Sequence, residues 1–95
     1  MIDLTKSEVI RAAQEAAGID AKDTGSPEVQ ISLLTWKIAC LQNHLQHFSK
    51  DKTAQRRLLF HVHSRRTLLS YLERIDSKRH LALATRLGIR IRRQA

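Results

Sequence analysis

Residues 23–31, Asp-Thr-Gly-Ser-Pro-Glu-Val-Gln-Ile, carry the signals of a helix start. Ser26 belongs to the residue types that cap helices, and Pro27 fits the first helical position, where a missing backbone donor costs nothing. Glu28 follows near the positive end of the helix dipole. The stretch therefore predicts that a long helix begins at Pro27.

The residues that follow favour one continuous helix from Pro27 to about Phe48. Their apolar side chains recur at steps of three and four, which is typical of one buried helical stripe. The stripe consists of Ile31, Leu34, Ile38, Leu41, Leu45 and Phe48. Trp36 lies off the stripe, and packing against another helix is favoured over a role as a base-stacking platform.

A second apolar pattern begins after the polar residues 49–52 and ends near Asp76. It consists of Leu58, Leu59, Val62, Leu69, Leu72 and Ile75. Because the connection between the two patterns is short, the two helices must lie antiparallel. The sequence thus predicts a long helical hairpin that turns near residue 50.

A shorter helix is expected before the hairpin. It opens with Thr5 and Glu8 at the spacing of a capping box and ends at Gly18. Its apolar face is mostly alanine, which gives the helix little to anchor it and leaves open a movement on binding. That face consists of Val9, Ile10, Ala13, Ala16 and Ala17.

A last helix is expected through Leu81, Ala84 and Leu87, stopped by Gly88, with a basic tail from about residue 89. The expected fold is all-α: four helices, of which the middle two form the long hairpin. With 95 residues, one proline and three glycines, the chain suits a single helical domain over residues 1–95.

Charge is divided unevenly along the chain. Residues 1–49 hold four Lys or Arg against six Asp or Glu, a net charge of −2, whereas residues 50–95 hold thirteen against three, a net charge of +10. A half-chain of this sign, in a protein of isoelectric point about 10.6, is typical of a protein that neutralises phosphates. Nucleic acid is favoured as the partner over a merely solvated basic face.

Other classes of function find little support. His61 and His63 are two residues apart and point to different sides of a helix, so no metal site and no cofactor are expected. Glycine-rich phosphate loops and nucleophile motifs are missing, so we expect no enzyme.

The single Cys40 excludes an internal disulfide and fits a reducing compartment. No apolar run reaches the ~20 residues that span a bilayer, and we expect an intracellular protein.

Residues 23–31 also begin a wider pattern that reaches the last helix. It continues with Leu34-Thr35, His44-Leu45, Lys50-Asp51, Arg65-Arg66, Leu68-Leu69, Tyr71-Leu72 and Leu87-Gly88-Ile89-Arg90. Over about residues 5–90 the chain resembles the bacterial-type family of the fifteenth protein of the ribosomal small subunit. The resemblance implies a structural constituent of that subunit, a primary binder of its ribosomal RNA that clamps a three-way junction and the adjoining duplex and aids assembly.

The resemblance also implies a setting and partners. The protein would reside in the ribosome of a bacterial cytoplasm, a mitochondrion or a plastid, with no membrane partner. Its main partner would be small-subunit ribosomal RNA. Contacts with neighbouring small-subunit proteins, and of the hairpin tip with large-subunit RNA at the subunit interface, are left open.

The open end of the hairpin is the first expected RNA site. A turn near residue 50 places position 30 opposite 70 or 71, so Gln30 and Tyr71 should be neighbours. A hydroxyl, an amide, a glycine and a tyrosine suit an RNA junction. In the family the matching positions contact a three-way junction, and two cations add phosphate contacts there. The expected junction site consists of Thr24, Gly25, Gln30, Lys37, Tyr71 and Arg74.

The closed end of the hairpin, called the tip below, is the second expected RNA site. His44, Asp51 and Arg56 lie on either side of the turn and are expected to converge. Histidine and aspartate suit 2′-hydroxyls and a guanine amino group in a shallow minor groove, and the family uses its tip for such a contact. Asp51 is equally suited to cap the third helix, and the two roles are compatible. His44 is alternatively a plain surface residue.

Four further cations are expected to position phosphates: Lys50, Lys52, Arg65 and Arg66.

The chain departs from the family near the tip. Ala54 stands where the family usually has serine, and Phe48 replaces a histidine. Gln55, Arg57 and His63 differ from the usual arginine and two glycines. A lost hydroxyl contact costs about 1 kcal/mol, partly offset if Thr53 or Gln55 supplies another donor.

Two competing functions remain at this point, a helical DNA-binding module and a helical adaptor for proteins or anionic membranes. A DNA reader should show a recognition helix after a tight turn, and a membrane binder should show bulky aromatic residues opposite a basic face. The long hairpin dominates instead, which favours RNA.

Overall fold

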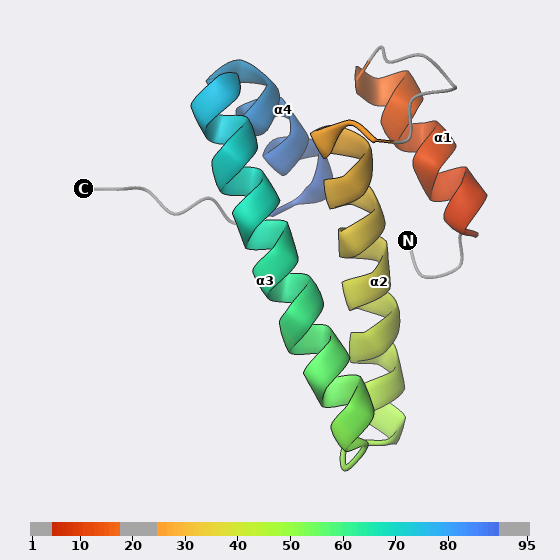
Figure 1. The fold of residues 1–95 in the computed structure, drawn as a ribbon. Helices are drawn as coiled ribbons and strands as arrows, with labels where there is room; N and C mark the ends of the chain where they lie inside the picture. Colours follow the sequence, from red (N-terminus) through yellow and green to blue (C-terminus); the bar gives the residue numbers. More distant parts are fainter. Residues whose placement is uncertain (1–4, 18–24, 90–95) are drawn as a thin grey trace.

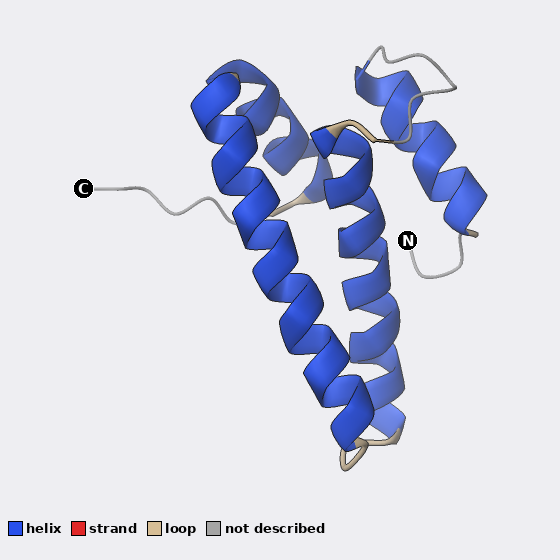
Figure 2. Ribbon diagram, viewed as in Figure 1, coloured by secondary structure: helices blue, strands red, loops and turns tan. Residues whose placement is uncertain are grey.

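The computed structural model describes residues 5–17 and 25–89. These residues form four helices: α1 (Lys6–Ala17), α2 (Pro27–His47), α3 (Lys52–Ile75) and α4 (Ser77–Leu87). No strand occurs within these two stretches (Figure 2). The prediction of an all-α fold with four helices and a long central hairpin is confirmed. The expected end of the first helix at Gly18 lies outside the described residues, as does all of the basic tail, expected from about residue 89, that follows Ile89.

The helices are arranged around the α2–α3 hairpin (Figure 1). The two long helices meet at the tip and diverge toward the other end, where α4 turns back and lies between them. α2 packs mainly against α3, α1 packs along α2, and α4 packs mainly against α3. The end where α4 lies is called the open end below.

Each helix boundary is set by a local signal. Ser26 is the N-cap of α2 with an extended backbone (φ −66°, ψ 150°) and Pro27 follows, although the Ser26 hydroxyl makes no capping hydrogen bond. At α1 the capping box forms in full: the Thr5 N–H donates to the Glu8 carboxylate (3.2 Å) and the Glu8 N–H donates to the Thr5 hydroxyl (3.3 Å). Both starts agree with the sequence prediction.

The corner between α3 and α4 contains one residue, Asp76. Its backbone N–H donates to the Leu72 carbonyl (2.8 Å) and ends α3, while its carboxylate accepts from the Arg79 N–H (3.2 Å) and begins α4. α4 ends at Gly88, whose backbone is left-handed (φ 68°, ψ 25°), and the Ile89 N–H then bonds the Ala84 carbonyl at 2.9 Å. This is the glycine stop that the sequence predicts.

The central core lies where α4 enters between the long helices. Ile31, Leu72 and Leu83 are buried together, one from each of α2, α3 and α4. Leu68, Leu69, Leu87 and Ile89 pack around them. Along α1, Val9 and Ala13 are buried, as are Val29 and Leu33 of α2.

Several residues of the predicted stripes are exposed instead. The expectations for Leu59 (71% exposed), Ile75 (49%) and Leu81 (57%) are wrong, and so is that for Phe48 (61%), which follows the last residue of α2. Ala16 of α1 is exposed as well. In α4 the buried face runs through His80, Leu83 and Ala84, and Leu87 packs against the core, so of the predicted stripe only Leu81 lies outside that face. Trp36 is half-buried.

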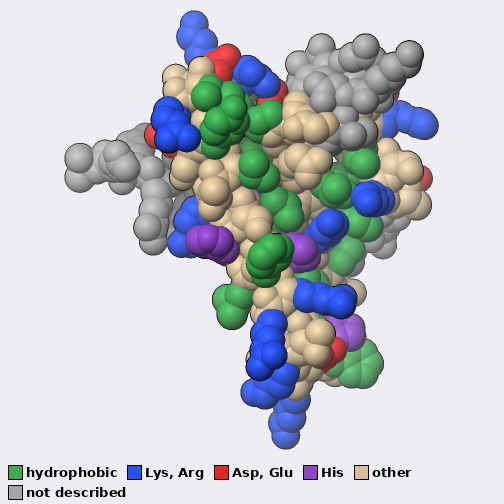
Figure 3. All heavy atoms as spheres, in the orientation of Figure 1, with side chains coloured by type: hydrophobic (Ala, Val, Ile, Leu, Met, Phe, Trp, Pro, Cys, Tyr) green, Lys and Arg blue, Asp and Glu red, His purple; other side chains and the backbone are tan. Residues whose placement is uncertain are grey.

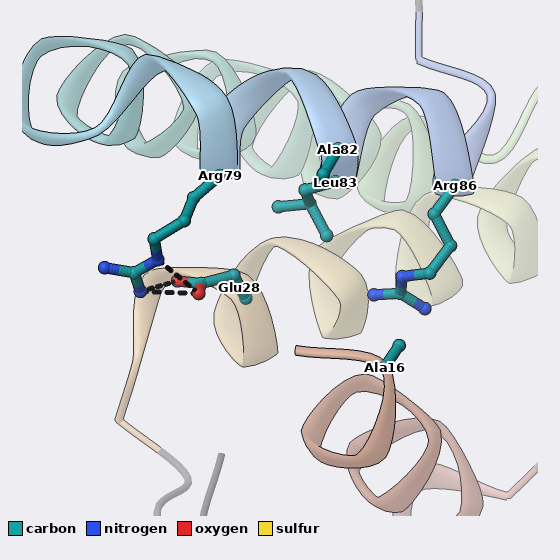
Figure 4. A pocket seen from close by; sticks show the side chains of 6 residues that line it. All are labelled: Ala16, Glu28, Arg79, Ala82, Leu83 and Arg86. Carbon is teal, nitrogen blue, oxygen red and sulfur yellow. Dashed lines mark hydrogen bonds and ion pairs between the residues drawn. The ribbon is translucent and has the colours of Figure 1, made fainter. Parts of the chain in front are cut away.

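A buried ion pair joins α4 to the first turn of α2. The Glu28 side chain is only 5% exposed, and the Arg79 guanidinium donates to both of its oxygens, with Nε–Oε2 at 2.8 Å (Figure 4). The Glu28 carboxylate holds the pKa of Arg79 above its ordinary value. Two turns further along α4, the Arg86 guanidinium donates to the Ser32 hydroxyl (3.0 Å). Glu28 is therefore more than a partner of the helix dipole, because it fixes α4 against α2.

We expect Arg79→Leu to destabilise the fold more than Glu28→Gln. Arg79→Leu leaves a buried carboxylate unpaired, which costs about 3 kcal/mol. Glu28→Gln leaves an arginine whose side chain is 45% exposed and can turn to water, which costs about 1 kcal/mol. Urea unfolding measures both, with Lys78→Leu on exposed α4 surface as the control. Equal losses, or the reverse order, would contradict the burial argument.

Candidate nucleic-acid interface

The tip joins two of its three predicted site residues. The Asp51 carboxylate accepts the Ala54 N–H at 3.1 Å and caps α3, and its other oxygen lies 2.9 Å from Nε2 of His44. The hydrogen bonds from His44 and Ala54 hold the pKa of Asp51 below its ordinary value. Arg56 is exposed, and within the described residues no hydrogen bond or ion pair joins it to either. Asp51 thus serves as a helix cap and also orients His44.

The residues that depart from the family shape this tip. The Phe48 ring stacks on the His44 ring, with centroids 4.9 Å apart and 29° between the planes. The Gln55 side-chain amide donates to the Ser49 carbonyl (2.7 Å), so one of its two hydrogens is engaged in the turn. Ala54 is 5% exposed, and its methyl group is covered by protein. His44 therefore offers its free edge rather than its whole ring to a partner.

Cations surround the tip. Lys50, Lys52 and Arg56 are all exposed there. Figure 3 shows Lys and Arg side chains gathered over the lower end of the hairpin, where the tip lies in Figure 1. Exposed cations at the end of a rod suit phosphates of an adjoining duplex.

The two predicted phosphate-binding arginines of α3 differ. Arg66 is exposed. Arg65 is half-buried, and its guanidinium lies 3.5 Å from the Thr35 hydroxyl of α2. Burial lowers the pKa of Arg65. Of this pair, only Arg66 presents its whole head group to solvent.

The Thr35–Arg65 contact also fixes the register of the hairpin. Moving five residues along each antiparallel helix from this pair sets Gln30 across from Ser70, one residue before Tyr71. Because the two helices diverge toward this end and α4 lies between them, the expected contact of Gln30 with Tyr71 stays a prediction. Tyr71 is 44% exposed, Gln30 is half-buried and Gly25 is exposed, while Thr24 lies outside the described residues.

Two cations were assigned to the junction site. The Arg74 guanidinium carbon lies 5.9 Å from the centre of the Tyr71 ring, so these two residues form one exposed unit. Lys37 lies elsewhere, on the seam between α2 and α3 beside Arg57 and His61. It is seven residues from Gln30, or about 10 Å along the helix. Of the six predicted junction residues, Tyr71 and Arg74 lie in contact with each other.

Sequence reasoning missed the polar contacts of α4. Arg79 and Arg86 contribute to the basic half of the chain, yet both point their head groups at α2. Burial lowers the pKa of Arg86. These contacts could have been inferred from the burial of their acceptors, Glu28 and Ser32 (4% and 1% exposed), but the sequence alone does not reveal that burial.

Neither a membrane span nor a metal cluster is found in the part of the chain that the structure describes. No helix there is long and apolar enough to cross a bilayer. No three His, Cys, Asp or Glu side chains there are grouped so as to hold a metal ion.

Comparison with known proteins gives one consistent family. A family model described as ribosomal protein S15 matches residues 9–90. The small ribosomal subunit protein uS15 of Syntrophomonas wolfei is 47% identical over 85 residues, covering 90% of this chain and 91% of that protein. The protein of the same name from Aeromonas hydrophila is 53% identical over 70 residues, covering 74% of this chain and 79% of its own length.

We expect the stabilising effect of the Asp51 carboxylate to depend on pH. Because the pKa of Asp51 is lower in the fold than in the unfolded chain, the charge stabilises the protein above the unfolded value of about 3.9 and ceases to do so as pH falls through the folded value. Asp51→Asn keeps a capping oxygen but loses the charge. Its melting temperature should lie below that of the unaltered protein at pH 6, and the gap should shrink at pH 3. A gap that is the same at both pH values would contradict this.

Proposed function

Because this chain belongs to the ribosomal protein S15 family, in which it is a structural protein of the small ribosomal subunit, we propose that it clamps ribosomal RNA at two places. The open end binds a three-way junction and the tip binds the minor groove of the adjoining duplex. Holding both at once fixes the relative orientation of RNA helices, which aids assembly of the subunit.

The spacing of the two ends carries this proposal. Gln30 and His44 are fourteen residues apart on one uninterrupted helix, which separates them by about 21 Å. Tyr71 and Asp51 are similarly separated along α3, by about 30 Å. A rod of this length, stiffened by the core around Leu72, reaches two surfaces of one folded RNA.

The exposed groups at each end suit their targets. At the open end the Tyr71 ring and the Arg74 cation offer stacking and phosphate binding together. At the tip His44 is held by Asp51, so its imidazole needs no reordering to meet a 2′-hydroxyl. Lys50, Lys52, Arg56 and Arg66 add phosphate contacts, which should make affinity strongly salt-dependent.

The setting follows from the same relatives. Both come from bacteria, which supports a bacterial ribosome over that of an organelle. We propose one RNA-binding domain over residues 1–95, with neighbouring small-subunit proteins as further partners. The tip, as the far end of the rod, is the surface we propose for contact with large-subunit RNA. The family is one of structural proteins, and no catalytic step is proposed.

We expect Tyr71→Ala to weaken binding to a three-way junction by about 1–3 kcal/mol, the usual loss when a base loses its stacking partner, and to leave binding to plain duplex nearly unchanged. Gln30→Ala should act in the same direction. Binding is measured by filter retention or mobility shift with excess duplex DNA and anionic vesicles as competitors. Leu81→Ala, which truncates an exposed apolar residue of α4, is the control. Equal losses on junction and duplex would argue against a junction site.

We expect Arg66→Gln and Arg65→Gln to differ. Arg66→Gln removes an exposed cation, so the slope of log affinity against log salt should fall by about 1, with stability changed by less than about 0.5 kcal/mol. Arg65→Gln breaks a contact with Thr35, so it should lower the free energy of unfolding and change the salt slope less. Salt titrations and urea unfolding measure the two effects. Identical behaviour of both variants would contradict the difference in burial.

A further inference from the structure

A hollow opens on the seam between α2 and α3, midway between the two proposed RNA sites. Its volume is about 460 Å³. Trp36, Lys37, Cys40 and Leu41 line it from α2, and Arg57 and His61 line it from α3. Figure 3 shows Lys and Arg side chains over the middle of the hairpin as well as at its tip.

The chemistry of the lining is divided into two parts. Trp36, Cys40 and Leu41 supply an indole, a thiol and an aliphatic surface. Lys37 and Arg57 supply positive charge, and none of the six lining residues is acidic. Burial, together with the positive charges of Lys37 and Arg57, lowers the pKa of His61.

Two polar atoms of the lining residues have unmet hydrogen-bonding capacity. Nε1 of Trp36 and Nδ1 of His61 are shielded from solvent and make no hydrogen bond within the described residues. Buried donors and acceptors are nearly always paired in folded proteins, and an unpaired one calls for an explanation. Because neither nitrogen is exposed, the groups that the hollow offers to a ligand are the apolar surface of its lining and the two cations.

We propose that this hollow binds one unpaired nucleotide of RNA, with its base against Trp36 and Leu41 and its phosphate between Lys37 and Arg57. An unstacked base presents a π-face that an indole can cover. The cations neutralise the phosphate. The inference rests on the proposed function, since the nucleotide is a part of the RNA that the two ends hold.

The second cation of the hollow comes from α3, which contributes Arg57 to the lining. Arg57 is exposed on α3, so it is free to close over a phosphate. The hollow lies about 10 Å along α2 from Gln30, on the way from the junction site to the tip.

The chain contains one tryptophan and one cysteine, and both line the hollow, so each reports on it alone. The full chain is titrated with a three-way-junction RNA that carries a single unpaired nucleotide in the adjoining duplex, and with the same RNA without it. We expect the first RNA to quench Trp36 emission and to slow alkylation of Cys40 at least about tenfold more than the second. Equal effects of the two RNAs would overturn the proposal.

Separate titrations with adenosine monophosphate, adenosine and inorganic phosphate distinguish the source of the ligand. The monophosphate should quench Trp36 at much higher concentration than the RNA, adenosine more weakly still, and phosphate alone should neither quench nor protect Cys40. Protection by phosphate equal to that by the monophosphate would mean that the base is not bound, and would overturn the proposal.

Arg57→Gln is the test variant, because it removes an exposed cation without touching the core. It should reduce the preference for the RNA with the unpaired nucleotide about tenfold, the effect of one contact worth 1.4 kcal/mol. Arg11→Gln, which removes one exposed cation from α1, is the matched control and should leave that preference unchanged. An equal loss of preference in both variants would mean that the cations act only by general charge attraction, and would overturn the proposal.

The two proposals fail in different ways. If the protein prefers junction RNA to duplex but ignores the unpaired nucleotide, the inference about the hollow is wrong and the two-ended clamp stands. If it shows no preference for the junction, the clamp itself is wrong.

Discussion

The ion pair between Glu28 and Arg79 is the constraint on which the open end depends. A carboxylate in the first turn of α2 is almost fully removed from water, and the bidentate guanidinium from α4 compensates its charge. The pair joins residues 51 apart in sequence and brings Leu83 between Ile31 and Leu72. The divergence of α2 from α3, and with it the surface on which Gly25, Gln30 and Tyr71 are displayed, follows from this wedge.

The arginines of the described helices differ in where their head groups point. Arg65, Arg79 and Arg86 direct their head groups at α2 and stabilise the packing of the helices. Arg56 and Arg66 remain exposed. Salt dependence should therefore reflect the number of exposed cations that reach phosphates rather than the formal net charge.

Local sequence signals predicted the helix boundaries well, but the apolar pattern predicted poorly which side chains are buried. Capping by Thr5 and Asp51 and the glycine stop at Gly88 act within one turn, so the sequence contains all that determines them. Whether Leu59 or Leu81 is buried depends on what covers the helix, which a stripe of threes and fours does not specify. In the site, the meeting of His44 with Asp51 followed from the short turn, whereas the half-burial of Arg65 required the register of two helices.

The single-residue corner at Asp76 leaves no slack between α3 and α4. One inserted residue would turn α4 by about 100° about its axis, carrying Arg79 away from Glu28 and Leu83 out of the core. A change in length at the tip turn would leave this core in place, but it would separate Asp51 from His44. The corner therefore tolerates no change in length without loss of the core, whereas a change in length at the tip affects the proposed RNA site.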